Sequence, residues 1–205
     1  MDCSKISVIV FDLGNVLIPF DYHKVLGKFE SIESGLGKKF GELYTDNYHV
    51  HRQFEKSEIS ADKFLEIVLG WLDHKIKKEE FCRVYSSLFT IDEKMVSLLP
   101  KLKQNYKLVL ISNTNYIHWK YGWKDYDFIK LFDKCILSYE VGSIKPEEKI
   151  YKAVEQFTNV SADQHFYTDD SEEYVGAAKK LGWDAVRFTG YDDYVRELKV
   201  RGVKV

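Results

Sequence analysis

Short runs of apolar residues alternate along this chain with stretches in which apolar residues recur every three or four positions. Within the first run, Ile6–Phe11, consecutive apolar residues lead directly to Asp12, which predicts a strand buried on both faces. Similar runs predict further strands at Lys107–Ile111, Lys134–Ser138, His165–Thr168 and Asp184–Phe188. Helical periodicity separates the later strands, at Met95–Gln104, Glu147–Phe157, Glu173–Leu181 and Asp193–Lys199. Strands that alternate with helices predict an α/β fold with a doubly wound, parallel, Rossmann-like sheet.

One connection in this pattern is unusually long. Between the first two predicted strands the chain shows only helical periodicity, as in Phe64/Leu65/Val68/Leu69/Leu72. Ser60 and Asp92 stand where helix caps are expected. Because the connection far exceeds an ordinary strand-to-helix loop, we predict a small helical subdomain over residues 19–91. The core domain would then comprise residues 1–18 and 92–205.

Composition excludes several classes of function. The chain has 205 residues and a net charge of −2, and its basic residues are dispersed, which argues against nucleic-acid binding. No stretch approaches the roughly 18 apolar residues of a membrane helix, and the first apolar run is too short for a signal sequence. Cys3, Cys82 and Cys135 lie far apart without metal-ligand spacing, which favours reduced thiols and a cytoplasmic location. The sequence leaves the oligomeric state open.

Polar residues follow four of the predicted strands. Asp12 follows the first, Ser112-Asn113-Thr114 the second and Asp169-Asp170 the fourth, and Lys145 lies a few residues beyond the third. Because the carboxyl ends of parallel strands open on one edge of a sheet, we expect these groups to converge. Two carboxylates suit a hard cation such as Mg²⁺, and a lysine with hydroxyl and amide groups suits anionic oxygens. The set predicts a site for a phosphoryl group.

These stretches resemble, in order and spacing, the four motifs of the haloacid dehalogenase superfamily. The matching segments are Val8–Leu17, Leu108–Asn115, Ser138–Pro146 and Phe166–Ala178. Members of this superfamily are mostly Mg²⁺-dependent phosphatases that work through an aspartyl-phosphate intermediate. The helical insert resembles the family's cap, and residues 19–91 are called the cap below.

The resemblance implies a metal site and a nucleophile. Asp12 would be the nucleophile and one Mg²⁺ ligand. The backbone carbonyl of Gly14 would be a second ligand. Asp170 would be the carboxylate ligand after the fourth strand, with Asp169 as a further ligand or directly beside it.

The resemblance also implies a phosphate site. Ser112, with the backbone amide of Asn113, would bind phosphate oxygens of the substrate. Lys145 would neutralise Asp12 and the group that is transferred. The expected partner is a small phosphorylated metabolite.

Two positions depart from the family pattern. Family phosphatases usually carry a general acid two residues after the nucleophile, and this chain has Gly14 there. Loss of a general acid costs about 10²–10⁴ in rate, and less with a good leaving group such as the anomeric oxygen of a sugar 1-phosphate. The segment Phe-Asp-Leu-Gly-Asn-Val also resembles the first motif of a bacterial branch of the family that includes glucose-1-phosphate phosphatases. Asn15 is either a donor that substitutes for the missing general acid or a turn residue. At position 174 this chain has a tyrosine where many relatives carry an asparagine.

Three histidines receive a structural interpretation. His49 and His51 lie in the cap and His118 lies just beyond the second motif, where each could reach a substrate. Surface exposure or packing accounts for them as well, and we favour that interpretation.

The leading hypothesis is therefore a Mg²⁺-dependent phosphatase of a small phosphorylated metabolite, with a sugar phosphate as one option. A 2-haloacid dehalogenase is an alternative, because that chemistry needs no acid at position 14; it leaves Asp169-Asp170 unexplained. A non-catalytic binding module is a second alternative, and Gly14 is its best support.

Overall fold

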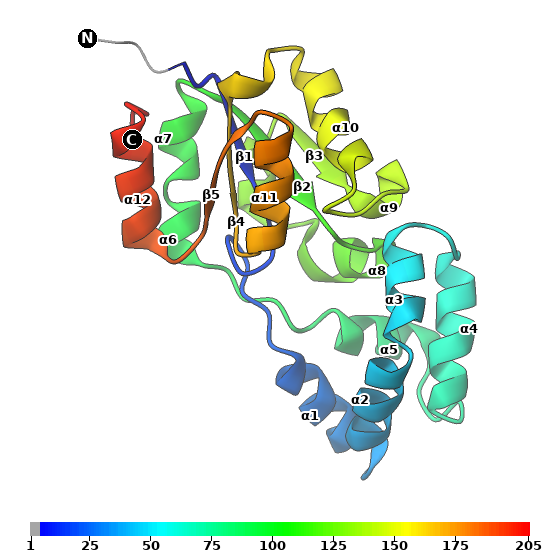
Figure 1. Ribbon diagram of the computed structural model, residues 1–205. Coiled ribbons are helices and arrows are strands. Elements are labelled where there is room, and N and C mark those ends of the chain that lie inside the picture. Colours follow the sequence, from blue (N-terminus) through cyan, green and yellow to red (C-terminus); the bar gives the residue numbers. More distant parts are fainter. Residues whose placement is uncertain (1–4) are drawn as a thin grey trace.

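The computed structural model describes residues 5–205 as a parallel sheet flanked by helices, with a group of further helices beyond one end (Figure 1). The sheet has five strands in the order β3-β2-β1-β4-β5. Their bounds are β1 Val8–Phe11, β2 Lys107–Ser112, β3 Lys134–Leu137, β4 His165–Asp169 and β5 Asp184–Arg187. The predicted fold class is confirmed, and each expected strand is present within two residues of its predicted bounds.

The central strand β1 is the point at which the chain reverses its direction across the sheet. It pairs with β2 on one side and with β4 on the other, so that Val10 lies opposite both Val109 and Tyr167. The chain first builds β2 and β3 on one side and later builds β4 and β5 on the other. Ligands of open α/β sheets bind at such a reversal, outside the carboxyl ends of the strands. Asp12 follows β1 at this position.

Alternate residues of the strands contribute to two separate hydrophobic layers. Ile9 and Phe11 pack with helices α6 (Glu93–Val96), α7 (Leu99–Lys103) and α12 (Tyr191–Val200) on one face. Val8 and Val10 pack with α10 (Glu148–Thr158) and α11 (Glu172–Lys180) on the other. The single helix predicted over residues 95–104 is instead two short ones. Pro100 lies in the first turn of α7 and cannot donate the hydrogen bond that would continue α6.

Five helices form the group beyond the end of the sheet and have a hydrophobic cluster of their own. They are α1 Tyr22–Ile32, α2 Leu36–Asp46, α3 Tyr48–Glu55, α4 Ala61–Trp71 and α5 Lys78–Tyr85. At its centre Phe29 lies against Phe40 and Phe81, with ring centroids 4.7 and 5.5 Å apart. The separate cluster supports our proposal that residues 19–91 form a cap. Ser60 and Asp92 accept hydrogen bonds from Lys63 N and Met95 N, so both predicted helix caps are confirmed.

Shorter elements connect the core. They are α8 Tyr116–His118, a π-helical turn Trp119–Trp123, α9 Ser138–Val141, and 3₁₀ turns at Asp127–Leu131 and Ala162–Gln164. Cys82 is a buried free thiol and Cys135 a partly buried one, whereas Cys3 lies outside the described residues. No helix between residues 5 and 205 is long and apolar enough to cross a membrane.

Candidate active site

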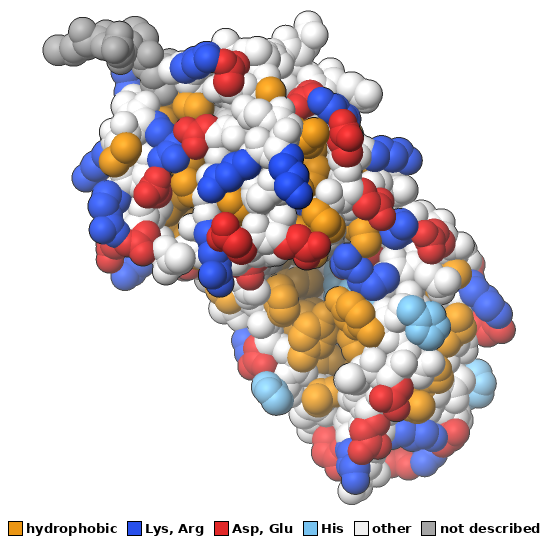
Figure 2. All heavy atoms as spheres, in the orientation of Figure 1, with side chains coloured by type: hydrophobic (Ala, Val, Ile, Leu, Met, Phe, Trp, Pro, Cys, Tyr) orange, Lys and Arg blue, Asp and Glu red, His pale blue; other side chains and the backbone are white. Residues whose placement is uncertain are grey.

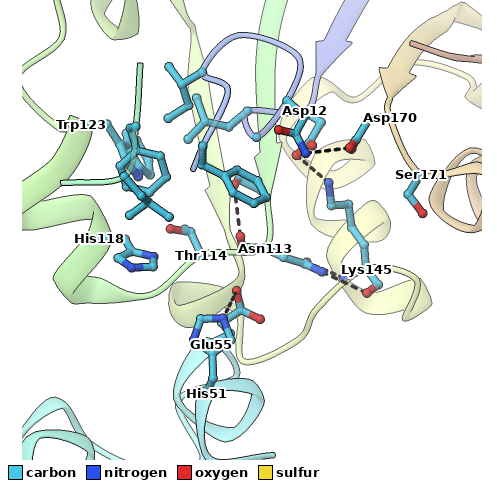
Figure 3. Close-up of a pocket in the computed structure, with 18 of the residues that line it drawn as sticks. Asp12, His51, Glu55, Asn113, Thr114, His118, Trp123, Lys145, Asp170 and Ser171 are labelled. Carbon is cyan, nitrogen blue, oxygen red and sulfur yellow. Dashed lines mark hydrogen bonds and ion pairs between the residues drawn. The ribbon is translucent and has the colours of Figure 1, made fainter. Parts of the chain in front are cut away.

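Asp12 and Lys145 meet at the carboxyl edge of the sheet although they are far apart in sequence. The Lys145 ammonium lies 2.6 Å from Asp12 Oδ1 and 2.6 Å from Asp169 Oδ2. Its side chain is 1% exposed, so the charge is removed from bulk water and depends on both carboxylates. Figure 3 shows Lys145 extending toward Asp12, with Asp170 beside them. The predicted convergence of the first, third and fourth motifs is thus present in the structure.

Burial makes this charge cluster electrostatically unusual. Burial raises the pKa of Asp12 to about 7, although the positive charge of Lys145 opposes the shift; the Asp169 carboxylate adds to it. Burial by itself would lower the pKa of Lys145, but Asp12 and Asp169 outweigh it and hold that pKa above its usual value. Lys145 therefore stays positively charged, and Asp12 is poised to exchange a proton near neutral pH.

Asp12, Asp169 and Asp170 form a group of carboxylates that suits a cation. Each offers an oxygen, and these three oxygens lie within 4.8 Å of one another. Hard divalent cations such as Mg²⁺ prefer this kind of oxygen donor. Gly14 lines the same cavity, and the metal-binding role of its carbonyl stays a prediction.

Asp169, the last residue of β4, and Asp170, the next residue, differ in their surroundings. Asp169 is fully buried and accepts hydrogen bonds from Lys145, from the Tyr167 hydroxyl and, at 2.8 Å, from Ser171 N. Asp170 lines the cavity and accepts one hydrogen bond of 2.9 Å from Asn15 Nδ2. Asp170 therefore has more free capacity for a cation, whereas Asp169 fixes the position of Lys145.

Asn113 holds the backbone of Lys145 as well as lining the cavity. Lys145 N donates to Asn113 Oδ1 at 2.7 Å, and Asn113 Nδ2 donates to Lys145 O at 3.1 Å. The bond between Lys145 and Pro146 is a cis peptide. Sequence reasoning assigned only the backbone amide of Asn113 and missed this positioning by its side chain. Ser112 is buried and lines the same cavity, and its hydroxyl donates a long hydrogen bond of 3.4 Å to Asn113 O.

The departures from the family pattern have physical counterparts. A Cβ atom at Gly14 would lie 3.0 Å from the Phe20 ring, so an aspartate there would require this ring to move. Asn15 has a left-handed φ of 54°, as expected of a turn residue, and its amide donates to Asp170. One N–H group of its side chain therefore holds a carboxylate, and its role as a substitute donor stays a prediction. The Tyr174 ring lies below the Lys145 ammonium, 5.0 Å from centroid to nitrogen, in a cation–π arrangement.

A cavity of about 290 Å³ opens in front of these residues and reaches the cap. Figure 3 shows the Asp12 cluster on one side, and His51 and Glu55 on the opposite side. Figure 2 shows hydrophobic side chains gathered along the junction between core and cap. The cavity residues from the cap and its connections that the sequence analysis did not assign to a site are Ile18, Phe20, Tyr22, Tyr48, His51, Arg52, Glu55, Leu88 and Phe89.

The structural interpretation of the three histidines is confirmed only in part. His49 is exposed, as expected. His51 and His118 are buried and pack inside the protein, but both also line the cavity, so the packing interpretation was incomplete. Burial, together with the nearby His51, lowers the pKa of His118 to about 3, so its ring is neutral.

Comparison with known proteins supports one family. Residues 40–188 match a family model described as haloacid dehalogenase-like hydrolase. A D-ribitol-5-phosphate phosphatase from Bacteroides thetaiotaomicron is 26% identical to this chain over 205 aligned positions, which cover 95% of the chain and 98% of that protein.

Solved structures agree with this assignment. A haloacid dehalogenase family enzyme from Bacteroides thetaiotaomicron, crystallised with magnesium and inorganic phosphate, has a TM-score of 0.78 and 29% identity. The match covers 89% of this chain and 93% of that one. An L-2-haloacid dehalogenase from Xanthobacter autotrophicus has a TM-score of 0.64 at 18% identity, covering 95% of this chain and 83% of that one, and shows the shared fold.

Proposed function

The chain belongs to the haloacid dehalogenase-like hydrolases, and on that premise we propose that it is a Mg²⁺-dependent phosphatase whose nucleophile is Asp12. One observation carries the proposal. The Asp12 carboxylate stands at the reversal point of the sheet, 2.6 Å from a buried lysine and within a group of three carboxylates suited to a cation. This arrangement brings a nucleophile and the charges that a phosphoryl group needs to one place.

Asp12 and Asp170 would hold the cation, with the Gly14 carbonyl as a further ligand and Asp169 beside them. When bound, Mg²⁺ supplies positive charge that offsets the phosphate oxygens and orients the ester. The related Bacteroides thetaiotaomicron enzyme, crystallised with magnesium and inorganic phosphate, supports the choice of this metal. The remaining chemistry is done by groups of the chain.

Asp12 attacks the phosphorus atom, forming a bond between a carboxylate oxygen and phosphorus as the bond to the leaving alcohol breaks. The leaving oxygen takes a proton from water, because position 14 carries no acid. A water molecule then attacks the phosphorus of the aspartyl phosphate, which releases inorganic phosphate and restores the Asp12 carboxylate. Lys145 neutralises Asp12, and Ser112 with the Asn113 amide binds the phosphate oxygens.

The substrate we propose is the phosphate monoester of a sugar or sugar alcohol. The relative from Bacteroides thetaiotaomicron acts on D-ribitol 5-phosphate, and the first motif resembles that of glucose-1-phosphate phosphatases. A cavity of about 290 Å³ lies at the small end of the range for ligand pockets, which favours a small metabolite.

Asp169 and Asp170 argue against both alternatives. A dehalogenase needs no cation, yet Asp170 is held toward the cavity by Asn15. A non-catalytic module would have no need to keep a buried lysine bonded to two carboxylates, since such a cluster is costly to bury. Joint binding of Mg²⁺ and beryllium fluoride, read as a rise in melting temperature, separates an active site from a degenerate one.

The proposal is tested by phosphate release from D-ribitol 5-phosphate and sugar 1-phosphates with Mg²⁺. We expect Asp12→Asn to lower kcat by at least about 10³-fold, because it removes the nucleophile, and EDTA to abolish activity. Asp127→Asn, at a side chain that is 94% exposed, is the matched control and should leave the rate unchanged. Equal rates for Asp12→Asn and the native protein would refute the assignment.

A further inference from the structure

We propose that Arg52 and Glu55 of the cap bind hydroxyl groups of the leaving alcohol, so that the enzyme selects phosphate monoesters of neutral, polyhydroxylated molecules. The inference rests on the proposed phosphatase function and assigns its specificity to two residues of α3. Both line the cavity that also contains Asp12, Lys145 and Asp170, and Figure 3 places Glu55 opposite Asp12.

The two side chains form a fixed donor–acceptor pair. Arg52 Nη1 lies 2.9 Å from Glu55 Oε2, and the Glu55 side chain is only 7% exposed. Burial raises the pKa of Glu55, but His51 and Arg52 outweigh it and hold that pKa below its usual value. Glu55 is therefore ionised and acts only as an acceptor, while Arg52 acts only as a donor.

The pair has unused hydrogen-bonding capacity. Each carboxylate oxygen can accept two hydrogen bonds; Oε1 has His51 Nε2 at 3.1 Å and Oε2 has Arg52. A guanidinium has five N–H donors and can serve Glu55 and a second acceptor together. A hydroxyl group both donates and accepts, so it can donate to Glu55 and accept from Arg52 at the same time.

His51 supports Glu55 and is itself a positioning residue. Its Nδ1 lies 2.9 Å from the Tyr85 hydroxyl and its Nε2 lies 3.1 Å from Glu55. Both ring nitrogens are therefore committed within the cap, and neither is left for a substrate. This fixes the carboxylate with respect to the buried aromatic cluster of the cap.

The charge of the pair determines what it rejects. Arg52 and Glu55 offset each other, so a second phosphate would meet the Glu55 carboxylate as well as the guanidinium. An alkyl chain would displace water from the Arg52 guanidinium and the Glu55 carboxylate. Because it cannot replace the hydrogen bonds of that water, its binding would be unfavourable. Neutral hydroxyl groups avoid both penalties. The aromatic residues on the same wall, Tyr22 and Tyr48 among them, can contact the carbon chain.

The test compares kcat/KM for four substrates: D-ribitol 5-phosphate, pentyl phosphate of equal carbon length, a pentitol bisphosphate, and acetyl phosphate, a mixed anhydride that presents no hydroxyl group. We expect the native enzyme to prefer D-ribitol 5-phosphate over pentyl phosphate by about 10²-fold, and to discriminate against a pentitol bisphosphate. Glu55→Gln should lower kcat/KM for D-ribitol 5-phosphate about tenfold or more, mainly through KM, and leave acetyl phosphate hydrolysis within about threefold.

Arg52→Gln is the second variant, because its side chain is 29% exposed and its loss threatens the fold less than that of buried Glu55. We expect the same loss of kcat/KM for D-ribitol 5-phosphate, with acetyl phosphate hydrolysis again little changed. His49→Ala, at an exposed residue on the same helix, is the control and should change kcat/KM for neither D-ribitol 5-phosphate nor acetyl phosphate. Melting curves establish that each variant is folded.

The outcomes separate this inference from the proposed function. Acetyl phosphate hydrolysis without a preference for the polyol ester, or an equal loss on all substrates in folded variants, would overturn the role of Arg52 and Glu55 alone. Absence of phosphate release from every substrate, acetyl phosphate included, would overturn the phosphatase function itself.

Discussion

The two walls of the cavity are built in opposite ways. On the core wall, Lys145 bonds to Asp12 and Asp169, which are 133 and 24 residues away in sequence. On the cap wall, Glu55 bonds to His51 and Arg52, which are four and three residues away on one helix. The core wall therefore exists only once the whole sheet has formed. The charged pair of the cap wall, Arg52 and Glu55, is carried by the single helix α3.

This difference between the walls suits the two proposed tasks of the site, attack on phosphorus and recognition of the leaving alcohol. Attack on phosphorus needs charges at fixed positions, and the carboxyl ends of paired strands provide them. Recognition of a leaving alcohol tolerates change more readily, and one amphipathic helix can be altered without disturbing the sheet. Outside the cavity, polar contacts also join the cap to the core: Lys56 lies 3.0 Å from Glu147, the Ser57 hydroxyl donates to Tyr139 O at 2.5 Å, and the Ser86 hydroxyl donates to Ile117 O at 3.1 Å.

The largest expected effect comes from breaking the core wall. Lys145→Met would leave Asp12 and Asp169 buried without their counter-charge, so the free energy of unfolding should fall by about 3–5 kcal/mol. Urea unfolding with EDTA present measures the change. Lys134→Met, the same substitution at an exposed lysine of the sheet, should have little effect. A loss no greater than that of the control would mean that the cluster does not depend on Lys145.

The core wall could be predicted from the sequence because sheet topology determines it. Once β1 and β4 are parallel neighbours, Asp12 and Asp170 must lie at one edge, whatever the length of the insert between them. Ser112 and Lys145 were expected at the same edge because they follow the next two predicted strands, and the four ordered motifs then gave them roles that stay predictions. On the core wall, the sequence did not reveal the contacts that position the site residues, such as the hydrogen bond from Lys145 N to the Asn113 side chain. A side chain that bonds to a backbone group far away in sequence leaves no local pattern.

The cap wall was missed for a different physical reason. Helix α3 is only Tyr48–Glu55, and Val50 and Phe54 are the only apolar residues that it buries, so the apolar pattern is too short to establish a helix from sequence. One signal was present. Tyr48, His51, Arg52 and Glu55 recur at helical spacing and so share one face, but such a polar face is equally typical of a solvent-exposed surface. Which way it points depends on how the cap packs on the core.

The pH dependence of cation binding is a smaller expected effect, and it tests whether residues of the core wall alone bind the cation. Burial raises the pKa of Asp12 from 3.8 to about 7, so the native state keeps a proton that the unfolded chain loses. This group therefore contributes stability at low pH that falls as the pH rises from about 4 to about 7. A cation must displace the same proton, so its affinity should rise about tenfold between about pH 6 and about pH 8.

Isothermal titration of Mg²⁺ at the two pH values measures this dependence. Asp12→Asn should abolish it, whereas Glu55→Gln on the opposite wall should retain it. A Glu55→Gln variant that loses the pH dependence would show that the walls titrate together and would contradict the separation drawn above.

The smallest expected effect concerns the contact between the walls. Lys56→Ala removes the ion pair with Glu147, whose other carboxylate oxygen accepts from Ser143 Oγ at 2.7 Å in the segment that leads to Lys145. The Lys56 and Glu147 side chains are 27% and 42% exposed, so water and salt weaken the pair. We expect KM to rise by at most about fivefold at low salt with kcat unchanged, and the difference to vanish at high salt.

Lys63→Ala is the matched control, because Lys63 pairs with Glu66 inside the cap and should leave KM unchanged. A fall in kcat for Lys56→Ala has a different meaning from a rise in KM. It would show that the cap helps to place Lys145, since Glu147 also accepts from Ile144 N, directly before that lysine. The catalytic wall would then depend on the position of the cap, and recognition of the leaving alcohol would control the chemistry as well as the binding.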